Sequence, residues 1–283
     1  MLSKSIVHVN LSSNQFSGAI DSLIFKSAGF LFVLDISNNA FFGSLPHVNR
    51  SISSTIMYLD FSNNNFTGKI PSLGLLQEVV LPANKLSGQI GEGIVGLINL
   101  RVVALYGNEF TATIPYNIGK LYYLEKLLLH SNYLNGSLPQ SLMNCSKLEE
   151  LNLRINFLQG ELSILDFSKL LHLKTFDLGN NFFSGILPSS LYSCKSLSEI
   201  CLPVNKLEEE ISRCNNLRTL ILSLNYYNES FLGDDENLIG PEGFQNLQIL
   251  GLGGCKLNGH VPWWLSRLSK LKVLDLSQNQ VQA

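Results

Sequence analysis

The sequence has little charge, no polybasic block and no long apolar run. Charged residues make up 15% of its 283 residues, and the formal net charge is -2. This balance excludes nucleic acid as a partner, because nucleic-acid binding requires a cationic surface. No run approaches the roughly 18 apolar residues that cross a bilayer. Residues 1–5 lead directly into a repeat without the apolar core of a signal peptide, so we expect neither a membrane anchor nor an export signal in the chain as written.

Catalytic and metal-binding patterns are also missing. The histidines are scattered over different phases of the sequence, and neither a nucleophile elbow nor a metal-ligand spacing accompanies them: His8, His47, His130, His172 and His260. Residues 251–254 are rich in glycine, but no phosphate-binding lysine follows them at the required spacing. Residues 233–237 are acidic, yet they lack the alternating ligands of a calcium loop. We therefore predict a protein that is not an enzyme and that uses no cofactor and no metal.

An asparagine recurs along the chain with a period of about 24 residues. It ends the pattern apolar-x-apolar-x-x-Asn, as in residues 127–132 and 151–156, and Cys255 takes one place in the series. The members of this asparagine ladder are Asn14, Asn39, Asn64, Asn84, Asn108, Asn132, Asn156, Asn181, Asn205, Asn225 and Asn279. Coils of this length cannot bury their own apolar face until neighbours stack on them. The sequence therefore predicts a solenoid, and its function is expected on a surface.

A single coil predicts the architecture. Leu127 and Leu129 point inward, so the residues beside them face outward from a strand. Stacking places these strands in one parallel sheet on the concave face, and the ladder asparagine can donate and accept hydrogen bonds between coils. Gly and Pro in segments such as 66–71 predict a turn and an irregular or 3₁₀ convex side with little true helix. The predicted fold class is an α/β solenoid.

We expect one repeat array over residues 1–283, with about 12 coils and without a capping coil at either end. Two ladder intervals are short and one is long, which predicts irregular coils near residues 71–79, 211–220 and 229–244. The short coils either close through a tight convex bridge or mark a lost segment, from an exon loss or an imperfect gene model. Both alternatives stay open.

The convex pattern Leu-x-Gly-x-Ile-Pro, together with Leu-x-Leu-x-x-Asn, resembles the plant-type leucine-rich repeats of receptor kinases and receptor-like proteins over nearly the whole chain. Residues 141–145, 190–197 and 251–265 are similar to a narrower group. This group comprises the tyrosine-sulfated glycopeptide receptor, the phytosulfokine receptor and related kinase-less receptor-like proteins.

The resemblance implies part of the extracellular domain of a plant cell-surface receptor, on the outer face of the plasma membrane. It implies membrane attachment only through segments absent from this chain. The implied partners are a secreted peptide, with tyrosine-sulfated peptides as one class, and a leucine-rich-repeat co-receptor kinase. A full-length relative can carry a Ser/Thr kinase, whereas this chain lacks one. The alternative is a truncated soluble leucine-rich-repeat protein that acts as an interaction scaffold or decoy, in growth or defence signalling.

The outward strand positions are the natural place for recognition. Tyr106, His130 and Arg154 occupy the position two before the ladder asparagine in three consecutive coils, with Lys126 close by. A guanidinium with an aromatic ring suits a carboxylate or a sulfate. Leu128 lies in the adjoining column and offers apolar surface to a peptide side chain. We therefore predict a ligand-binding patch at these five residues.

An ordinary solvated surface is the alternative to this ligand site. In that interpretation the five side chains are simply varied outward positions, and Glu150 pairs with Arg154. Solvated surface is also the interpretation of the four outward aspartates, which are Asp35, Asp60, Asp177 and Asp275.

The cysteines fall into two groups. Cys145, Cys194 and Cys214 share one phase on the convex side, where we expect small buried residues. A disulfide between Cys194 and Cys214, in adjacent coils, is the alternative. Cys201 occupies an outward strand position, which predicts an exposed free thiol in an exported chain.

Six Asn-x-Ser/Thr sequons give mild support for secretion, since several would arise by chance in a chain rich in Asn and Ser. The candidate glycosylation sites are Asn49, Asn65, Asn135, Asn144 and Asn228, and the sixth sequon is at Asn10. Asn135 and Asn144 are favoured because they lie off the concave sheet.

Overall fold

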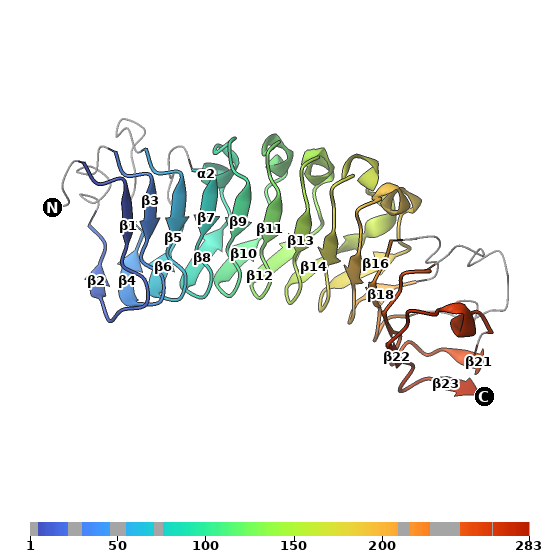
Figure 1. Ribbon diagram of the computed structural model, residues 1–283. Helices are drawn as coiled ribbons and strands as arrows, with labels where there is room; N and C mark the ends of the chain where they lie inside the picture. Colours follow the sequence, from blue (N-terminus) through green and yellow to red (C-terminus); the bar gives the residue numbers. More distant parts are fainter. Residues whose placement is uncertain are drawn as a thin grey trace.

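The protein is a solenoid in which short strands from successive coils lie side by side (Figure 1). The computed structural model describes residues 5–21, 30–45, 55–70, 76–208, 216–226, 244–261 and 263–282. Over these ranges, no helix is both long enough and apolar enough to span a membrane. One continuous apolar core runs from Val9 to Leu268 between the sheets and the turns.

A twelve-stranded parallel sheet, called the first sheet below, takes one strand from each coil in sequence order. Its strands are β1 (His8–Asn10), β3 (Val33–Asp35), β5 (Tyr58–Asp60), β7 (Glu78–Val80), β9 (Val102–Ala104), β11 (Lys126–Leu128), β13 (Glu150–Asn152), β15 (Thr175–Asp177), β17 (Glu199–Cys201), β19 (Thr219–Ile221), β20 (Ile249–Gly251) and β22 (Val273–Asp275). In β11 the middle residue Leu127 is buried, and it aligns with Val103 of β9 and Leu151 of β13. The predicted parallel solenoid is therefore confirmed, with the apolar positions facing the core.

The ladder asparagines join each coil to the one before it. Asn156 Nδ2 donates to Leu129 O of the preceding coil at 3.0 Å and to Leu153 O of its own turn at 3.0 Å. Its Oδ1 accepts from Leu134 N at 3.0 Å. The side chain is buried, so it satisfies backbone groups that water does not reach. The predicted donor and acceptor roles are confirmed.

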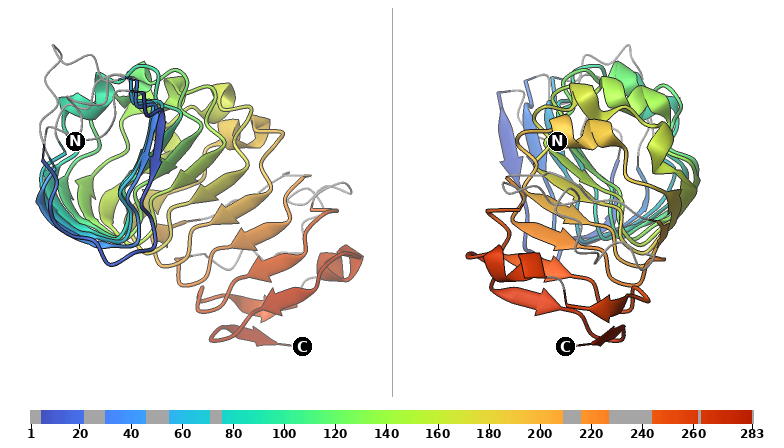
Figure 2. Two further views of the ribbon diagram at one scale, coloured as in Figure 1. Left: turned by 60° about the vertical axis from the view of Figure 1, so that its left-hand side comes forward. Right: turned by 90° about the vertical axis from the view of Figure 1, so that its right-hand side faces the viewer.

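A nine-stranded parallel sheet, called the second sheet, follows the ladder asparagines around each coil (Figure 2). It consists of β2 (Ser17–Ala19), β4 (Ala40–Ser44), β6 (Asn65–Gly68), β8 (Lys85–Gln89), β10 (Glu109–Ala112), β12 (Tyr133–Gly136), β14 (Phe157–Glu161), β16 (Phe182–Gly185) and β18 (Lys206–Leu207). The Gly and Pro of these segments predicted a turn, and the structure shows that a short strand precedes the turn. The segment alternates exposed and buried residues, as in β6. Its glycine has a positive φ, +79° at Gly68, and bends the chain only where the strand ends.

The remaining convex side is mostly 3₁₀ helix, as expected. The 3₁₀ helices are η1 (Ile118–Lys120), η2 (Gln140–Asn144), η3 (Leu162–Ile164), η4 (Phe167–Lys169), η5 (Ser189–Ser193) and η7 (Trp263–Arg267). The α-helix α2 has four residues (Glu92–Val95), and β21 (Asn258–His260) pairs with β23 (Gln280–Gln282) in a separate two-stranded sheet. Short turns suffice here because each coil shares its core with both neighbours.

The first sheet stays in register across the irregular coils. Tyr58 aligns with Glu78 across the first short interval, and Glu199 aligns with Thr219 across the second. Thr219 aligns with Ile249 across the long interval. The convex parts of the expected irregular coils, at residues 71–75, 211–215 and 229–243, lie outside the described residues. The differences in coil length therefore leave the outward columns of the first sheet intact.

Candidate functional site

The five residues of the predicted site lie together on the outward face of the first sheet. Lys126 and Leu128 belong to β11, which pairs with β9 on one side and β13 on the other. Tyr106 follows β9, His130 follows β11 and Arg154 follows β13. Neighbouring parallel strands are about 4.8 Å apart. These five residues therefore form a continuous surface, called the central patch below.

Tyr106 and His130 form the aromatic part of the central patch. Their ring centroids are 4.3 Å apart and their planes differ by 10°. His130 Nδ1 is buried and has no hydrogen-bond partner among the described residues. Nε2 is therefore the ring nitrogen left for a ligand. The stack holds the imidazole in one orientation, which reduces the ordering that binding would require.

The His130 imidazole is held in its neutral form. Burial lowers its pKa from the ordinary value, the charge of Arg154 lowers the pKa further, and Glu150 opposes both effects. Lys126, the other cation of the patch, is paired with Glu150. At neutral pH the imidazole can therefore act as a hydrogen-bonding group without a charge of its own.

We expect the pKa of His130, measured by NMR titration of the free protein, to lie below its value in the unfolded chain. Because the folded pKa is lowered, the contribution to stability is present above the ordinary pKa of 6.5. It is lost as the pH falls from that value through the folded pKa. Arg154→Ala should raise the folded pKa, and His130→Gln should remove this part of the pH dependence of unfolding. A folded pKa at or above the unfolded value would contradict the argument.

Arg154 is the cation of the central patch that remains available to an anion. It is exposed and makes no ion pair and no side-chain hydrogen bond with the described residues. The hypothesis that Glu150 pairs with Arg154 is wrong, because Glu150 Oε2 lies 3.4 Å from Lys126 Nζ. Gly179 takes the corresponding position in the next coil, so that side of the Arg154 column carries no side chain.

Two cations at the opposite ends of the strands from Arg154, Arg101 before β9 and Lys174 before β15, pair with carboxylates of a neighbouring coil. Arg101 donates to both carboxylate oxygens of Glu125, at 2.9 and 3.0 Å, and Lys174 Nζ lies 2.6 Å from Glu149 Oε2. Such exposed pairs contribute little to stability. They do reduce the positive charge at that end of the strands, whereas the charge of Arg154 stays available to an anion.

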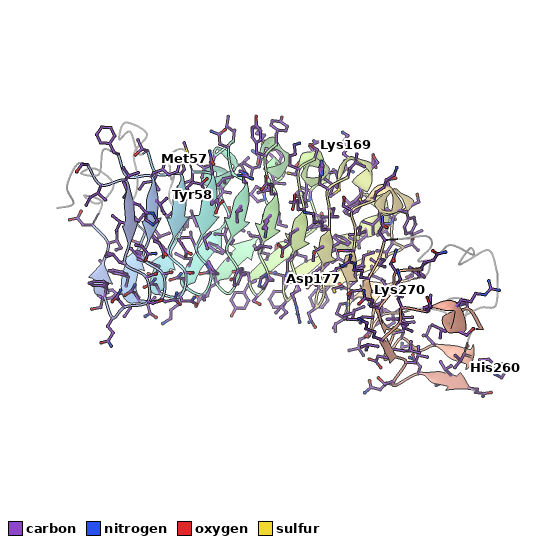
Figure 3. All side chains as sticks on the ribbon, viewed as in Figure 1. Met57, Tyr58, Lys169, Asp177, His260 and Lys270 are labelled. Atoms are coloured by element: carbon purple, nitrogen blue, oxygen red, sulfur yellow. The ribbon has the colours of Figure 1, made fainter. Side chains whose placement is uncertain are left out.

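Sequence reasoning missed Asp177 as a neighbour of Arg154. Asp177 ends β15, one strand from β13, where Figure 3 labels it. Burial raises its pKa, whereas a hydrogen bond from Gly179 N, at 3.0 Å, and the charge of Arg154 lower it. The sequence could have shown this neighbour. Asp177 occupies the same strand position as Asn152 in the preceding coil, and Arg154 follows Asn152 by two residues.

The outward aspartates share a structural role. Each accepts a hydrogen bond from the backbone N–H two residues later, at 2.9 to 3.0 Å: Asp35 from Ser37, Asp60 from Ser62, Asp177 from Gly179 and Asp275 from Ser277. This is the local turn that Asp favours. The bonds explain why Asp recurs at this position without assigning the four residues to a ligand.

Burial raises the pKa of each cysteine in the part of the chain that the structure describes. Cys145 and Cys194 are buried, as expected, and burial raises their pKa values to about 12 and about 11. Cys201 is a free thiol, as expected, but it is half-buried and not fully exposed, and burial raises its pKa to about 11. Cys194 is a free thiol, and its suggested partner Cys214 lies outside the described residues.

Three candidate glycosylation sites are on the described surface. Asn65 and Asn135 are exposed on β6 and β12 of the second sheet, and Asn144 is exposed at the end of η2. Asn49 and Asn228 lie outside the described residues. Among the residues that are described, no group of three His, Cys, Asp or Glu side chains could hold a metal ion.

The repeats and the fold define a class of protein. The family model described as Leucine Rich Repeat matches residues 55–74, 123–145, 172–194 and 246–268. These matches fall on coils of the parallel solenoid. The chain is thus built from leucine-rich repeats.

The relatives in sequence are plant receptors. Residues of this chain are 50% identical over 68 positions to Receptor-like protein 3 of Arabidopsis thaliana, covering 24% of this chain and 9% of that protein. They are 44% identical over 66 positions to Phytosulfokine receptor 1 of the same plant, covering 23% of this chain and 6% of that protein. The resemblance to the phytosulfokine receptor group and to receptor-like proteins is confirmed, although each match spans a small part of the relative.

Several of the solved structures that match are also plant receptors. The ectodomain of the receptor kinase GASSHO1/SCHENGEN3 from Arabidopsis thaliana, in complex with CASPARIAN STRIP INTEGRITY FACTOR 2, superposes with a TM-score of 0.84 and 29% identity. The match covers 97% of this chain and 33% of that chain. The plant peptide hormone receptor RGFR1 in complex with RGF2 gives a TM-score of 0.85 and 27% identity, covering 96% and 43%.

A third structure contains a receptor together with a co-receptor. The Arabidopsis receptor kinase HAESA, in complex with the peptide hormone IDA and the co-receptor SERK1, matches with a TM-score of 0.67 and 26% identity, covering 98% of this chain and 54% of that chain. This chain thus has the architecture of plant leucine-rich-repeat receptor ectodomains and spans about a third to a half of the three ectodomains.

Proposed function

We propose that this chain is a peptide-recognition module from the extracellular part of a plant cell-surface receptor. Its ligand is a secreted peptide with an anionic group, such as a sulfated tyrosine, and the ligand lies across the first sheet at the central patch. The observation that carries the proposal is the exposed Arg154, which forms no ion pair with a carboxylate of the described residues and lies beside the Tyr106–His130 stack. The module performs no chemistry, and any kinase activity belongs to another part of a receptor or to a partner.

The chemistry of the patch favours such a ligand. A guanidinium offers a planar fork of donors to a sulfate or carboxylate, and Nε2 of His130 can add a further hydrogen bond. Leu128, half-buried in the adjoining column, offers apolar contact to a peptide side chain. A leucine-rich-repeat co-receptor kinase is the proposed signalling partner. The HAESA complex, which holds a peptide hormone and SERK1, supports this part of the proposal by similarity.

Two synthetic peptides test the proposal by calorimetry on the full chain. One is a capped pentapeptide with a sulfotyrosine between two alanines on each side, and the other carries unmodified tyrosine. We expect tighter binding of the sulfated peptide. A charge-assisted hydrogen bond contributes about 1.5 to 3 kcal/mol, so Arg154→Ala should weaken binding by roughly tenfold to a hundredfold.

Arg218→Ala is the matched control, because Arg218 is also exposed but precedes β19, three coils away. It should leave the affinity unchanged. Equal affinities for the two peptides, or equal losses in the two variants, would refute the assignment of the anion site to Arg154.

A further inference from the structure

The second sheet carries several large aromatic side chains that are exposed to solvent. Tyr133, Phe157 and Phe182 stand on the adjacent strands β12, β14 and β16, with 52%, 49% and 44% of their surface exposed. The ring centroids of Tyr133 and Phe157 are 6.2 Å apart, and those of Phe157 and Phe182 are 6.3 Å apart. On β4, Phe42 is 53% exposed. Contiguous apolar surface of this kind usually marks a contact with something.

Each sequon on the second sheet adjoins one of these aromatic residues. Asn135 follows Tyr133 by two residues on β12, and both are exposed, so the two side chains share a face. In the neighbouring strand Asn135 aligns with Phe157. The other sequon shows the same arrangement, because Asn65 of β6 aligns with Phe42 of β4. Aligned residues of neighbouring parallel strands are about 4.8 Å apart, which is within reach of the first sugar of a glycan.

The side-chain amides of these two asparagines are available for modification. Neither Asn65 nor Asn135 makes a side-chain hydrogen bond with the residues that the structure describes. Asn10 differs, because its Nδ2 donates to Asp35 Oδ2 at 3.0 Å and its Oδ1 accepts from Ser12 N at 2.9 Å. Asn144 Oδ1 accepts from Lys169 Nζ at 3.3 Å. The two sequons beside aromatic residues are therefore also those with the freest amide groups.

We propose that N-linked glycans on Asn65 and Asn135 pack on the aromatic side chains of the second sheet. The glycan of Asn135 covers Tyr133 and Phe157, and the glycan of Asn65 covers Phe42. The inference rests on export of the chain, which is part of the proposed function. The same spacing recurs at Tyr226 and Asn228 in the sequence, where Asn228 lies outside the described residues.

The modification needs a donor of a known chemical class, a lipid-linked oligosaccharide pyrophosphate. The asparagine Nδ2 bonds to the anomeric carbon of the first sugar, while the bond from that carbon to the pyrophosphate oxygen breaks. The lipid pyrophosphate leaves, and Nδ2 gives up one proton to a base of the transferase. No electron is gained or lost.

Packing of the glycans has two physical consequences. A sugar presents an apolar C–H face that lies well on an aromatic ring, so the contact buries ring surface that water now reaches. The second sheet becomes a sugar-covered face, unsuited to a protein partner. The central patch on the first sheet stays free for its ligand.

Site occupancy is the first test. The full chain, secreted from plant cells behind an added signal peptide, should carry glycans at Asn65 and Asn135 and none at Asn10 in glycopeptide mass spectrometry. Unmodified Asn65 and Asn135 in the secreted protein would overturn the inference and leave peptide binding untouched. Loss of peptide binding with both sites occupied would overturn the proposed function instead.

A double-mutant cycle tests the packing itself. Ser137→Ala removes the glycan at Asn135 without changing the asparagine, and should lower the Tm by about 2 to 4 °C. In a Tyr133→Ser, Phe157→Ser background the same removal should change the Tm little. The cycle is repeated at Asn65, where Thr67→Ala removes the glycan and Phe42→Ser removes the aromatic ring. Tyr122→Ser, at an exposed tyrosine of the convex side, is the control background and should preserve the full loss.

Hydroxyl-radical footprinting keeps the proposal testable if a glycan-free variant fails to fold. The glycans are removed from the folded protein with a peptide N-glycosidase. Oxidation of Phe42, Tyr133 and Phe157 should then rise several-fold, while oxidation of Tyr122 stays constant. Equal oxidation before and after removal, or equal Tm losses in all backgrounds, would show that the glycans do not pack on these rings.

Discussion

Asn156→Ala is expected to reduce the free energy of unfolding by about 3 to 5 kcal/mol, because it leaves several buried backbone groups without partners. Nδ2 of Asn156 donates to Leu129 O and Leu153 O, and Oδ1 accepts from Leu134 N. The side chain is 6% exposed, so water cannot replace these bonds. Urea denaturation gives the loss, and hydrogen exchange should locate the weakened coils around β13 and β14.

Asn14→Ala is the matched control for this ladder position. Asn14 is exposed, and the structure gives its side chain two hydrogen bonds, both to its own turn, at Leu11 O and Ser12 O. Solvent can take over such bonds, so the expected loss is below about 1 kcal/mol. Equal losses at the two positions would mean that the bonds between coils do not carry the stabilisation.

Gly119→Ala is expected to destabilise the protein by about 3 kcal/mol or more, because the added Cβ has no room. It would lie against the backbone of the next coil, 2.8 Å from the carbonyl carbon of Ser141 and in direct overlap with the carbonyl oxygen. Backbone atoms cannot rotate away, so η1 and η2 would have to separate. The hydrogen bond from Gly119 N to Ser141 Oγ, at 3.3 Å, would be disturbed as well.

Gly91→Ala provides the comparison in the same denaturation experiment. No atom lies within 4 Å of the Cβ added there, and the φ of Gly91 is outside the positive range. The substitution should be neutral or stabilise by up to about 1 kcal/mol, since alanine restricts the unfolded chain. A loss at Gly91 as large as at Gly119 would show that close packing of η1 on η2 does not explain the effect.

The spacing of Leu and Asn was sufficient to predict the first sheet and the columns on its outward face. A repeat sets the register of its own strands, so Tyr106, His130 and Arg154 had to occupy neighbouring coils. The second sheet was harder to predict. Its strands, such as Tyr133–Gly136, are short and contain a glycine, so the turn signals of Gly and Pro outweighed the alternation of exposed and buried residues.

The sequence by itself determined that the chain is a leucine-rich-repeat solenoid, because every coil repeats the same few apolar and amide positions. It also determined which side chains face outward, because alternation along a strand is a local property. Only the tertiary structure decided that Glu150 pairs with Lys126 and leaves Arg154 open to an anion. It also decided that Asn135 faces Phe157 and Asn65 faces Phe42. These contacts depend on the rotamers and on the alignment of neighbouring strands, which the pattern within one coil does not contain.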